Sequence, residues 1–379
     1  MPHVIVVGAG VFGAWTAHHL RAAGAEVTLI DQYGPANPRA SSGDHSRILR
    51  CGYGADEIYS RFARRSLVQW QALEERSRAS LWHPCGVLLL AAADDPYFIA
   101  TRQTLEEGGY ALEVLDPPRL RARYPHLDAS DIATALLEPE CGVLMARRAV
   151  RTLVQELVQS GTVYLRGQVA VVPSAGTVTS LLLADGAEVN GDAFVFACGP
   201  WLPSVFRSTL DGLIRPSRQN VIYFGAPPGD ERFGQASTPA WIDRPAGIYG
   251  IPDLEDRGVK VGIDEHGPPI DPDGADRTPD AGALARARAW VERRFPAMKG
   301  APVVEARVCQ YENTSNGDLL IDRHPAHDNV WLVGGGSGHG FKHGPAVGER
   351  AANLVLTGAA THPRFSLATK GTHAARAVF

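Results

Sequence analysis

The chain has 379 residues, of which 45% are hydrophobic and 21% charged, and its formal net charge is −4 with a pI near 6.4. This length exceeds a single hydrophobic core, so two domains are expected, and the composition is typical of a soluble globular enzyme. The weakly acidic balance gives no reason to expect a nucleic-acid partner, and no apolar run approaches the ~20 residues that span a membrane.

The N-terminal segment and the spacing of the cysteines indicate the cellular compartment that we expect for the protein. The first apolar run, 4–7, is too short for the apolar region of a secretory leader and ends in a glycine turn. The cysteines are scattered singly with no CxxC pair, which argues against a zinc site or a disulfide framework. We therefore expect a cytoplasmic protein with no metal and no membrane partner. The cysteines are Cys51, Cys85, Cys141, Cys198 and Cys309.

The start of the chain predicts a βαβ unit. An apolar run at 4–7 leads into a glycine turn at 8–13 and a helix-forming segment at 14–23, and a second apolar run at 27–30 ends at Asp31. This order of strand, tight turn, helix, strand and acid is the pattern of a dinucleotide-binding unit. The alternative is an ordinary glycine turn in a βαβ unit.

Each glycine of the turn has a physical purpose. Gly8 permits the turn, Gly10 lets backbone amides approach a pyrophosphate, and Gly13 lets the helix pack closely on the strand. The helix N-terminus then offers partial positive charge and free N–H groups to the phosphates. Asp31 follows Gly13 by eighteen residues, where a carboxylate would accept hydrogen bonds from ribose hydroxyls. The unit alone does not distinguish NAD from FAD.

The rest of the chain alternates helices and strands. A polar loop at 32–46 is long enough to suggest a function, and it leads into a segment ending at Arg50. Apolar residues at helical spacing predict helices at 57–81, two within 95–123, and others at 147–159, 281–295 and 346–356. Short apolar or alternating runs predict strands at 85–92, 132–137, 142–144, 163–166, 169–173, 178–183, 193–197 and 330–333, with a turn at 174–176. Aromatic-rich strands and loops at 215–263 suit the wall of a substrate domain, and 268–277 is a polar loop.

A strand followed by glycines occurs three times, at the N-terminus, near residue 198 and near residue 335. A nicotinamide dehydrogenase keeps its nucleotide fold contiguous in the first half of the chain. A return to a buried strand and a glycine loop near the end indicates a discontinuous cofactor domain, which favours FAD over NAD.

Lysine is rare in this chain, with four among the 37 basic residues. Arginine evidently serves wherever a generic positive charge suffices, whereas lysine is a compact point charge with a mobile pKa. Lys260 and Lys342 are therefore candidates for a specific role. Lys299 and Lys370 lie in polar surroundings and are attributed to chance.

Several motifs occur together at matching spacings. They are the Gly8 turn with Asp31, the Gly43-Asp44 loop ending in Arg47 and Arg50, Tyr249 and Lys260 eleven residues apart, Cys309, Ile321-Asp322 with His324-Pro325, and the run Ser337 to Lys342. With these motifs the chain resembles the family of FAD-dependent amino acid and amine oxidases, within the D-amino acid oxidase-like superfamily, across nearly its whole length. Within that family it is most similar to the sarcosine and N-methyltryptophan oxidases.

The resemblance implies an α/β (α+β) flavoprotein of two domains. A Rossmann-type FAD-binding domain is expected to be interleaved with a substrate domain built on an antiparallel sheet. The expected FAD-binding domain comprises 1–82, 142–214 and 310–379, and the expected substrate-binding domain comprises 83–141 and 215–309.

Two residues are implied to act at the flavin itself. In this family a cysteine in the context of Cys309 forms a thioether to the flavin, whereas the residues alone would suggest an inert buried thiol. The thiolate attacks, so a cation such as Arg47 would help. Lys260 stands where the family places an oxygen-activating lysine, because a fixed cation in a dry site stabilises the negative charge that builds on oxygen. The alternative for Lys260 is a strand lysine that extends to solvent.

Three residues are implied to hold the substrate. Lys342 and Arg50 match the lysine and arginine that bind the substrate carboxylate, for which arginine offers a bidentate fork. Arg50 would otherwise be a surface ion pair. Tyr249 would form part of the substrate wall and donate a phenolic hydrogen bond, with core packing as its alternative.

The remaining expected FAD contacts come from the three glycine elements and the loop after Asp31. Together with Asp31, Arg47, Cys309 and Lys342 they are Gly8, Gly10, Val11, Phe12, Gly13, Gln32, Ser41, Ser42, His45, Val169, Cys198, Gly199, Trp201, Gly336, Gly338, His339, Gly340 and Phe341.

One position departs from the family pattern. Sarcosine oxidases carry a histidine four residues after the oxygen-activating lysine, and here that residue is Asp264. A carboxylate there would disfavour a plain carboxylate nearby and would pair with a second amine or cationic group on the substrate, or it would simply neutralise Lys260. We therefore expect a larger or more basic amino acid or secondary amine than sarcosine.

The reaction implied is oxidation of a C–N bond of a secondary amine or an N-methyl or cyclic amino acid, with imine hydrolysis and reduction of O2 to H2O2. The alternative within flavin chemistry is a dehydrogenase that passes electrons to a quinone or carrier protein. An NAD-dependent dehydrogenase and a non-catalytic role are more distant alternatives. The expected partners are the small-molecule substrate and O2, and the protein is expected to be a monomer.

Overall fold

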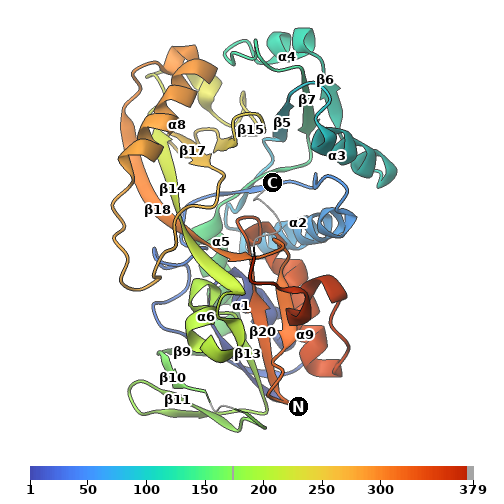
Figure 1. Ribbon diagram of the computed structural model, residues 1–379, viewed down its shortest axis with the longest axis vertical. Coiled ribbons are helices and arrows are strands. Elements are labelled where there is room, and N and C mark those ends of the chain that lie inside the picture. Colours follow the sequence, from blue (N-terminus) through green and yellow to red (C-terminus); the bar gives the residue numbers. More distant parts are fainter. Residues whose placement is uncertain (173–174, 374–379) are drawn as a thin grey trace.

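The computed structural model describes residues 1–172 and 175–373 (Figure 1). Residues 173–174 fall at the end of a predicted strand and the start of a predicted turn, and residues 374–379 end the predicted cofactor domain. These parts of the predictions lie outside the described residues.

A six-stranded sheet occupies the lower half of the view in Figure 1. Its order is β19-β20-β13-β1-β2-β9, and all neighbours are parallel except β19 and β20. Its central strand β1 is an apolar run without alternation, as expected of a parallel strand covered on both faces. The bounds are β1 His3–Val7, β2 Glu26–Asp31, β9 Val163–Arg166, β13 Ala193–Phe196, β19 Leu320–Arg323 and β20 Val330–Gly334.

Helices pack against this sheet and against each other. Helix α1 begins directly after the first glycine turn and packs along α9, where a Cβ on Gly348 would lie 2.4 Å from the Trp15 carbonyl carbon. Helix α2 contacts α9, and α5 contacts α1. The bounds are α1 Val11–Ala22, α2 Glu57–Ser77, α5 Ala146–Gln159 and α9 Gly344–Thr357.

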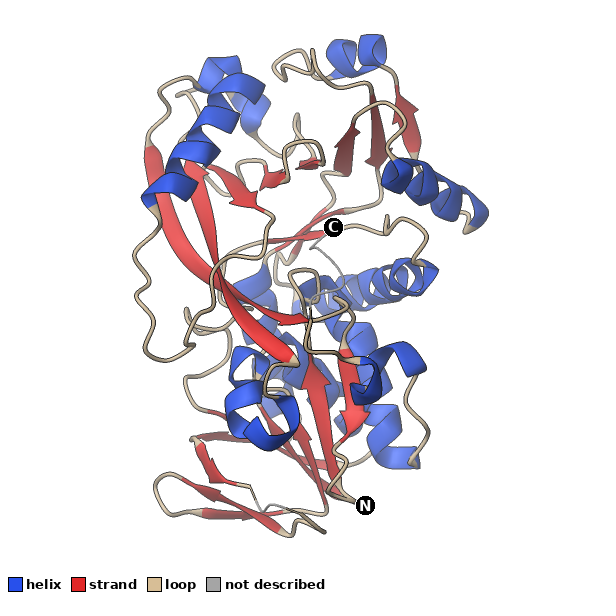
Figure 2. Cartoon of the chain, in the orientation of Figure 1, coloured by secondary structure: helices blue, strands red, loops and turns tan. Residues whose placement is uncertain are grey.

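An eight-stranded, largely antiparallel sheet forms the upper half, in the order β18-β14-β17-β16-β15-β5-β7-β6. Helices α8 (Ala281–Arg294), α3 (Pro96–Glu107) and α4 (Pro117–Arg123) accompany it (Figure 1). The long pair β14 and β18 runs from the upper half toward the lower half (Figure 2). The bounds are β5 Val87–Ala91, β6 Glu113–Leu115, β7 Thr134–Glu138, β14 Ile214–Phe224, β15 Ala240–Asp243, β16 Ile248–Ile251, β17 Val259–Ile263 and β18 Val303–Thr314.

The remaining strands form two small sheets. In one, β3 (Arg47–Leu49) and β4 (Trp82–His83) flank β8 (Gly142–Leu144), and this sheet carries the segment that contains the predicted arginines. The other consists of β10 (Val169–Val171), β11 (Ser180–Leu183) and β12 (Glu188–Asn190). Short helices α6 (Leu202–Val205) and α7 (Arg207–Leu210) follow β13.

The predicted mixed α/β class, with a Rossmann-type sheet and an antiparallel sheet, is confirmed. The predicted helix 57–81 ends four residues early, at Ser77, because Arg78 adopts a left-handed conformation with φ of 56°. The predicted helix–loop–helix within 95–123 contains a short strand, β6, which pairs with β7.

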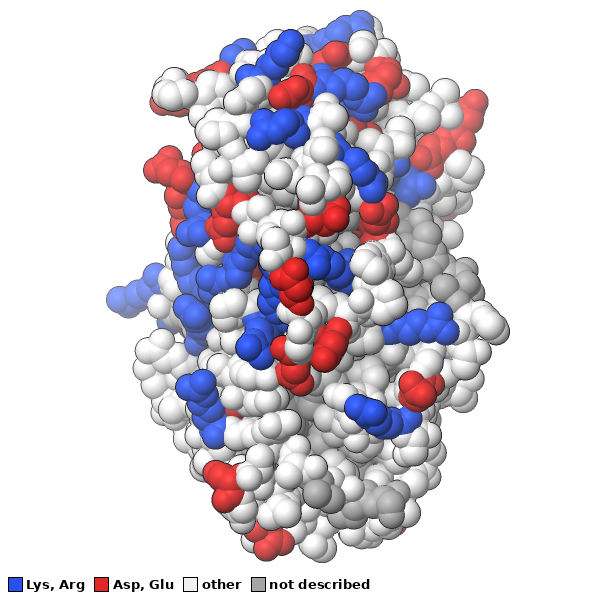
Figure 3. All heavy atoms as spheres, turned by 60° about the vertical axis from the view of Figure 1, so that its left-hand side comes forward, with Lys and Arg blue, Asp and Glu red and all other residues white. Residues whose placement is uncertain are grey.

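On the face shown in Figure 3, side chains of both charges lie mainly in the upper and middle parts, and Lys and Arg gather across the middle. Within 1–172 and 175–373, no helix is long and apolar enough to cross a membrane.

Candidate active site and cofactor cavity

The first glycine turn has the geometry that its sequence predicts. Gly8 has φ of 108°, and a Cβ there would lie 2.3 Å from the Ala197 carbonyl oxygen. A Cβ on Gly13 would lie 1.8 Å from the Gly8 carbonyl oxygen, so only glycine permits this close packing of helix on strand. By contrast, a Cβ on Gly10 would meet only the Ser42 hydroxyl, at 3.6 Å. Gly10 therefore faces open space.

Asp31 ends β2 and closes the turn. Its carboxylate accepts hydrogen bonds from Ala9 N at 2.7 Å and from Tyr33 N and Gly34 N at 2.9 and 2.7 Å. Burial raises the pKa of Asp31 despite these donors, which favour its ionised form. A carboxylate has about four lone-pair sites, so this group still has capacity to accept a bond from a ligand hydroxyl.

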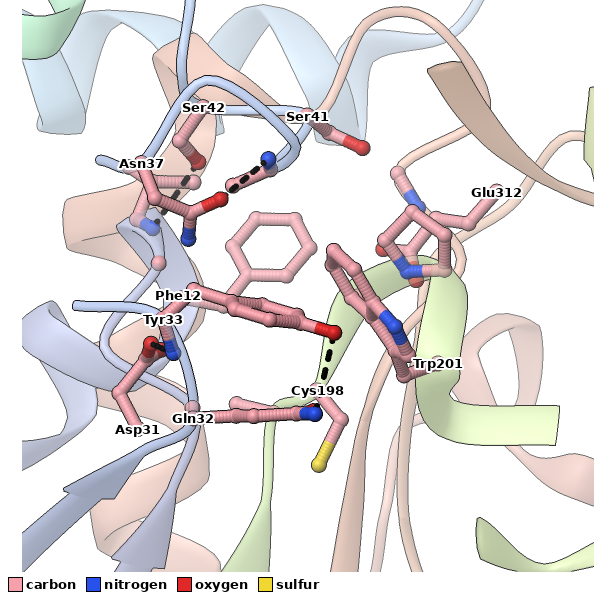
Figure 4. Close-up of a pocket in the computed structure, with 18 of the residues that line it drawn as sticks. Phe12, Asp31, Gln32, Tyr33, Asn37, Ser41, Ser42, Cys198, Trp201 and Glu312 are labelled. Carbon is pink, nitrogen blue, oxygen red and sulfur yellow. Dashed lines mark hydrogen bonds between the residues drawn. The ribbon is translucent and has the colours of Figure 1, made fainter. Parts of the chain in front are cut away.

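A cavity opens beside the turn, enclosing about 1270 Å³ of space that is partly continuous with solvent. Asp31, Gln32 and Tyr33 lie on one side and Trp201 and Glu312 on the other (Figure 4). Predicted contacts that line it are Gly8, Gly10, Val11, Phe12, Asp31, Gln32, Ser41, Ser42, Arg47, Val169, Cys198, Gly199, Trp201, Gly336, Gly338, Gly340 and Phe341.

The other predicted contacts lie near this cavity without lining it. Gly13 lies beneath the turn. His45 points toward Arg257 and Glu305, with its Nε2 2.5 Å from Arg257 Nη2. The Cys309 Sγ accepts a hydrogen bond from Arg47 Nη2 at 3.3 Å, and Arg47 does line the cavity. His339 and Lys342 belong to the second cluster described below.

The cavity fits a dinucleotide by the chemistry of its walls. Helix α1 begins at the turn with no side-chain cap on its Gly10 N-cap, so its N-terminal dipole faces the cavity. The Ser42 hydroxyl accepts a hydrogen bond from Val11 N at 3.2 Å, and Gly8 N and Ala9 N donate to Ile30 O and Asp31. The other N–H groups in the first turn of α1 have no intrahelical acceptor and would serve an anion.

A buried carboxylate that was not among the predicted site residues joins the predicted cations. Asp44 Oδ2 lies 2.6 Å from Lys260 Nζ and 2.7 Å from Arg47 Nη1. Its Oδ1 accepts a hydrogen bond from the Tyr223 hydroxyl at 2.9 Å and lies 3.6 Å from Arg307 Nη1. Burial alone would raise the pKa of Asp44, but Lys260 and Arg47 outweigh burial and hold the pKa well below its usual range. Three cations thus surround one carboxylate, and the cluster is net positive.

A second buried cluster brings Arg50 and Lys342 together. Lys342 Nζ donates to the Tyr53 hydroxyl at 2.6 Å and to the His339 carbonyl at 3.0 Å. Arg50 stacks over the Tyr53 ring at 4.4 Å and donates to the Tyr97 hydroxyl at 3.1 Å. Burial, together with the charge of Arg50, lowers the pKa of Lys342 well below its usual value. The two side chains share one aromatic ring, and both are buried.

Asp264 faces this second cluster. Burial raises its pKa to about 7, and Arg50 and Lys342 limit the rise. The Tyr311 hydroxyl donates to Asp264 Oδ1 at 3.4 Å. Tyr249 lies across from Gly262 in the neighbouring strand, where a Cβ would lie 2.3 Å from its ring. The carboxylate partner of Lys260 is Asp44, so Asp264 does not fill the neutralising role that the sequence left open.

Glu138 holds the chain just after Arg50. Its buried carboxylate accepts from Cys51 N at 2.6 Å and from Gly52 N at 3.1 Å. With Cys51 and Cys141 it forms the one described group of three potential metal ligands, all within 4.8 Å of one another. Because the carboxylate already accepts from two backbone N–H groups, we read it as an anchor for the arginine segment.

Sequence reasoning missed Asp44, Tyr311, Glu312 and Glu138 as site residues. Asp44 directly precedes the predicted His45, and Tyr311 lies two positions after the predicted Cys309. This closeness in sequence is the signal that could have found them. Nothing in the sequence near Glu138 relates it to residues some 87 positions earlier.

Comparison with known proteins extends the picture over nearly the whole chain. A family model described as FAD dependent oxidoreductase (DAO) matches residues 3–354. Monomeric sarcosine oxidase of a Bacillus species is 29% identical over 368 residues, covering 95% of this chain and 93% of that protein. N-methyl-L-tryptophan oxidase of Citrobacter koseri is 26% identical over 361 residues, covering 93% of this chain and 94% of that protein.

Solved structures agree on the fold. L-proline dehydrogenase from P. horikoshii superposes with a TM-score of 0.82 at 21% identity, covering 97% of this chain and 96% of that chain. The fructosamine oxidase of Aspergillus fumigatus has a TM-score of 0.80 at 20% identity, covering 97% and 89%.

Proposed function

The chain belongs to the DAO family of FAD-dependent oxidoreductases, and from this premise we propose that it oxidises a C–N bond of a secondary amine or of an N-methyl or cyclic amino acid. Bound FAD would accept a hydride from the C–N carbon, and the return of the electrons to O2 would form H2O2. The imine product hydrolyses in water.

The observation that carries the proposal is the pair of cationic clusters. Arg50 and Lys342 would bind and orient the substrate carboxylate, and Tyr53 holds both side chains in place. Lys260 would stabilise the negative charge that develops on oxygen, since it is only 1% exposed and belongs to a net positive cluster. Burial of both clusters strengthens these interactions.

The cofactor domain would comprise 1–82, 142–214 and 310–379, and the substrate domain 83–141 and 215–309. The strands of the six-stranded sheet and those of the eight-stranded sheet support this division. Strand β18 crosses the proposed boundary, and it brings Cys309 and Tyr311 to the junction of the two sheets.

We further propose that FAD is attached through Cys309. Arg47 supports this role because its guanidinium donates to the Sγ atom and would stabilise the attacking thiolate. Burial opposes the charge of Arg47, but Cys309 and Asp44 together raise its pKa.

Asp264 shapes the substrate class. An ionised Asp264 would compete with the substrate carboxylate for Arg50 and Lys342, and it would favour a substrate with a second amine or cationic group. Tyr249 and Tyr311 would form the wall of this space. The protein would act as a monomer in the cytoplasm.

The test is anaerobic bleaching of the flavin absorbance by a panel of sarcosine, other N-methyl amino acids, cyclic imino acids, and primary D- and L-amino acids. We expect rapid bleaching by one class and stoichiometric H2O2 when air is readmitted. If dithionite bleaches the flavin and no amine does, the substrate class is wrong. If an amine bleaches it but little H2O2 forms, the alternative dehydrogenase, with a quinone or carrier protein as acceptor, replaces the oxidase.

A further inference from the structure

A loop from the eight-stranded sheet reaches the cofactor cavity. It joins β17 to α8, and Asp273 near its tip lines the cavity while it remains exposed to solvent. Asp273 Oδ1 accepts a hydrogen bond from the Tyr33 hydroxyl at 2.5 Å and another from the Trp201 indole Nε1 at 2.8 Å. Both aromatic side chains also line the cavity. One carboxylate oxygen of the proposed substrate domain therefore connects two walls of the cofactor cavity.

These two walls flank the glycine turn that suits a pyrophosphate. Tyr33 follows β2, Trp201 ends a short 3₁₀ turn after β13, and these strands lie on either side of β1 in the six-stranded sheet. Figure 4 shows the Tyr33 hydroxyl directed toward Trp201, and the centroids of the two rings are 5.7 Å apart. The contact through Asp273 therefore spans the cavity at the carboxyl ends of the parallel strands, where ligands bind in sheets of this kind.

The loop is preformed around Asp273. Asp273 N donates a hydrogen bond to Asp271 Oδ1 at 3.0 Å, which closes a turn at the tip. Arg218 of β14 holds both sides of this tip, because its backbone N donates to the Pro268 carbonyl at 2.8 Å and its guanidinium donates to carbonyl groups within 276–278. The tip is thus anchored at both ends to the eight-stranded sheet, and the two bonds from the aromatic side chains fix it over the cavity.

The hydrogen bonds of the Tyr33 hydroxyl leave its single hydrogen for Asp273. Gln32 Nε2 and Arg39 Nη1 donate to this hydroxyl at 3.0 and 3.3 Å, and a phenol has one hydrogen to donate. The Trp201 indole is a donor only, so it too needs an acceptor. A carboxylate oxygen satisfies both donors, and its charge makes both bonds stronger than bonds to a neutral acceptor.

We propose that Asp273 closes a gate through which FAD enters and leaves the cavity. The gate consists of the loop 268–278 together with Tyr33 and Trp201, and passage of FAD requires both hydrogen bonds to Asp273 to break. Because both bonds are exposed to water, the gate opens without disturbing a buried core. Asp273 acts through the two aromatic side chains and is a positioning residue. The proposal rests on FAD binding, which the family membership supplies, and it is independent of the amine substrate.

The experiment follows FAD uptake and release by stopped-flow flavin fluorescence, in the full chain carrying Cys309→Ala so that binding is reversible. With Asp273→Ala added, we expect both rate constants to rise about tenfold, from the loss of two hydrogen bonds to a charged acceptor, and the dissociation constant to change by less than about threefold. A gate limits entry and exit alike, whereas a direct contact with FAD would slow release alone. Unchanged rates, or faster release with unchanged uptake, would refute the gate.

A matched control and a double substitution connect the effect to these bonds. Asp276→Ala removes a carboxylate that accepts from Thr278 within the same loop, and it should leave both rates unchanged. Tyr33→Phe should speed both steps by itself and add little once Asp273→Ala is present, because the two changes remove the same hydrogen bond. Fully additive effects would contradict the proposal.

Trypsin provides a measurement that does not depend on FAD. The gate loop contains Arg277, and we expect cleavage after this residue to be faster in Asp273→Ala than in the parent chain, both without FAD. Equal cleavage of the two chains would show that Asp273 does not hold the loop in place. A chain that takes up no FAD would overturn the proposed function as well, whereas FAD uptake at rates unchanged by Asp273→Ala overturns only the gate.

Discussion

Lys260 Nζ lies 2.6 Å from Asp44 Oδ2, and the two side chains are 1% and 3% exposed although they are 216 residues apart in sequence. The same carboxylate oxygen lies 2.7 Å from Arg47 Nη1. This shared carboxylate links the proposed oxygen site to the arginine that contacts Cys309. It fixes Lys260 without neutralising the cluster as a whole.

Replacing Lys260 should separate the two half-reactions. In Lys260→Met we expect reoxidation of the reduced flavin by O2 to slow by about 10²–10³-fold, since one preorganised charge is lost. Anaerobic flavin reduction by substrate should change far less. Stopped-flow absorbance measures both rates. The exposed Lys299→Met is the matched control, and equal slowing of both half-reactions in Lys260→Met would contradict the oxygen role.

Removing the charge of Asp44 should destabilise the fold. Asp44→Asn leaves Lys260 and Arg47 without a shared counter-charge in a buried site, and breaking such a pair lowers the free energy of unfolding by about 3–5 kcal/mol. Because the folded pKa of Asp44 is depressed, its stabilisation is present above the unfolded pKa of about 3.9 and is lost as the pH falls through the folded pKa. Urea unfolding should thus show a constant difference from the parent chain above about pH 5 that shrinks only in strong acid. The exposed Asp271→Asn serves as control, and no difference at pH 7 would argue against the pair.

Arg50 and Lys342 should favour substrates that carry a carboxylate over amines that lack one. In Lys342→Met we expect kcat/KM for amino acid substrates to fall by about 30-fold or more, from the ~2–5 kcal/mol attached to a buried charge pair. Amines that lack a carboxylate should lose much less. Steady-state kinetics on matched substrates with and without the carboxylate tests this, and an equal loss for both would remove Lys342 from carboxylate binding.

Asp264 should make substrate binding depend on pH near neutrality. Its pKa is raised to about 7, so the side chain is neutral below that pH and competes for Arg50 and Lys342 above it. A simple carboxylate inhibitor should therefore bind more weakly as the pH rises from 6 to 8, and Asp264→Asn should remove that trend. The stability of the fold should change in the same direction: because the raised pKa disfavours ionisation in the fold, Asp264 lowers stability as the pH rises from about 4 to 7.

Asp264→His should change the order of preferred substrates, and an unchanged order would refute the substrate-class hypothesis.

The mass of the denatured chain tests whether FAD is covalently attached at Cys309. The denatured chain should be heavier than its sequence by one flavin, and Cys309→Ala should return to the mass of the chain with its FAD released on denaturation. Cys85→Ala, at another partly buried cysteine, is the control and should keep the added mass. A Cys309→Ala chain that retains the flavin through denaturation would place the bond elsewhere.

The local pattern of the sequence predicted most elements and the dinucleotide turn. Strand β9 and the start of α8 fall where apolar spacing placed them, and Gly8 and Gly13 pack as their positions require. These features depend on neighbours within a few residues, which is the range over which helical and strand periodicity carries information. The sequence did not predict that α2 ends at Ser77, because the apolar pattern continues past the residue that adopts the left-handed conformation.

What the sequence determined by itself is the family, the mixed α/β class and the residue types available for chemistry, because motifs at fixed spacings and apolar periodicity are properties of the chain alone. Only the tertiary structure decided which charges meet: that Asp44 serves Lys260, that Asp264 faces Arg50 and Lys342, and that Glu312 borders the cofactor cavity. The pKa of a carboxyl group depends on burial and on charges brought close by segments far apart in sequence, and both exist only once the sheets have packed.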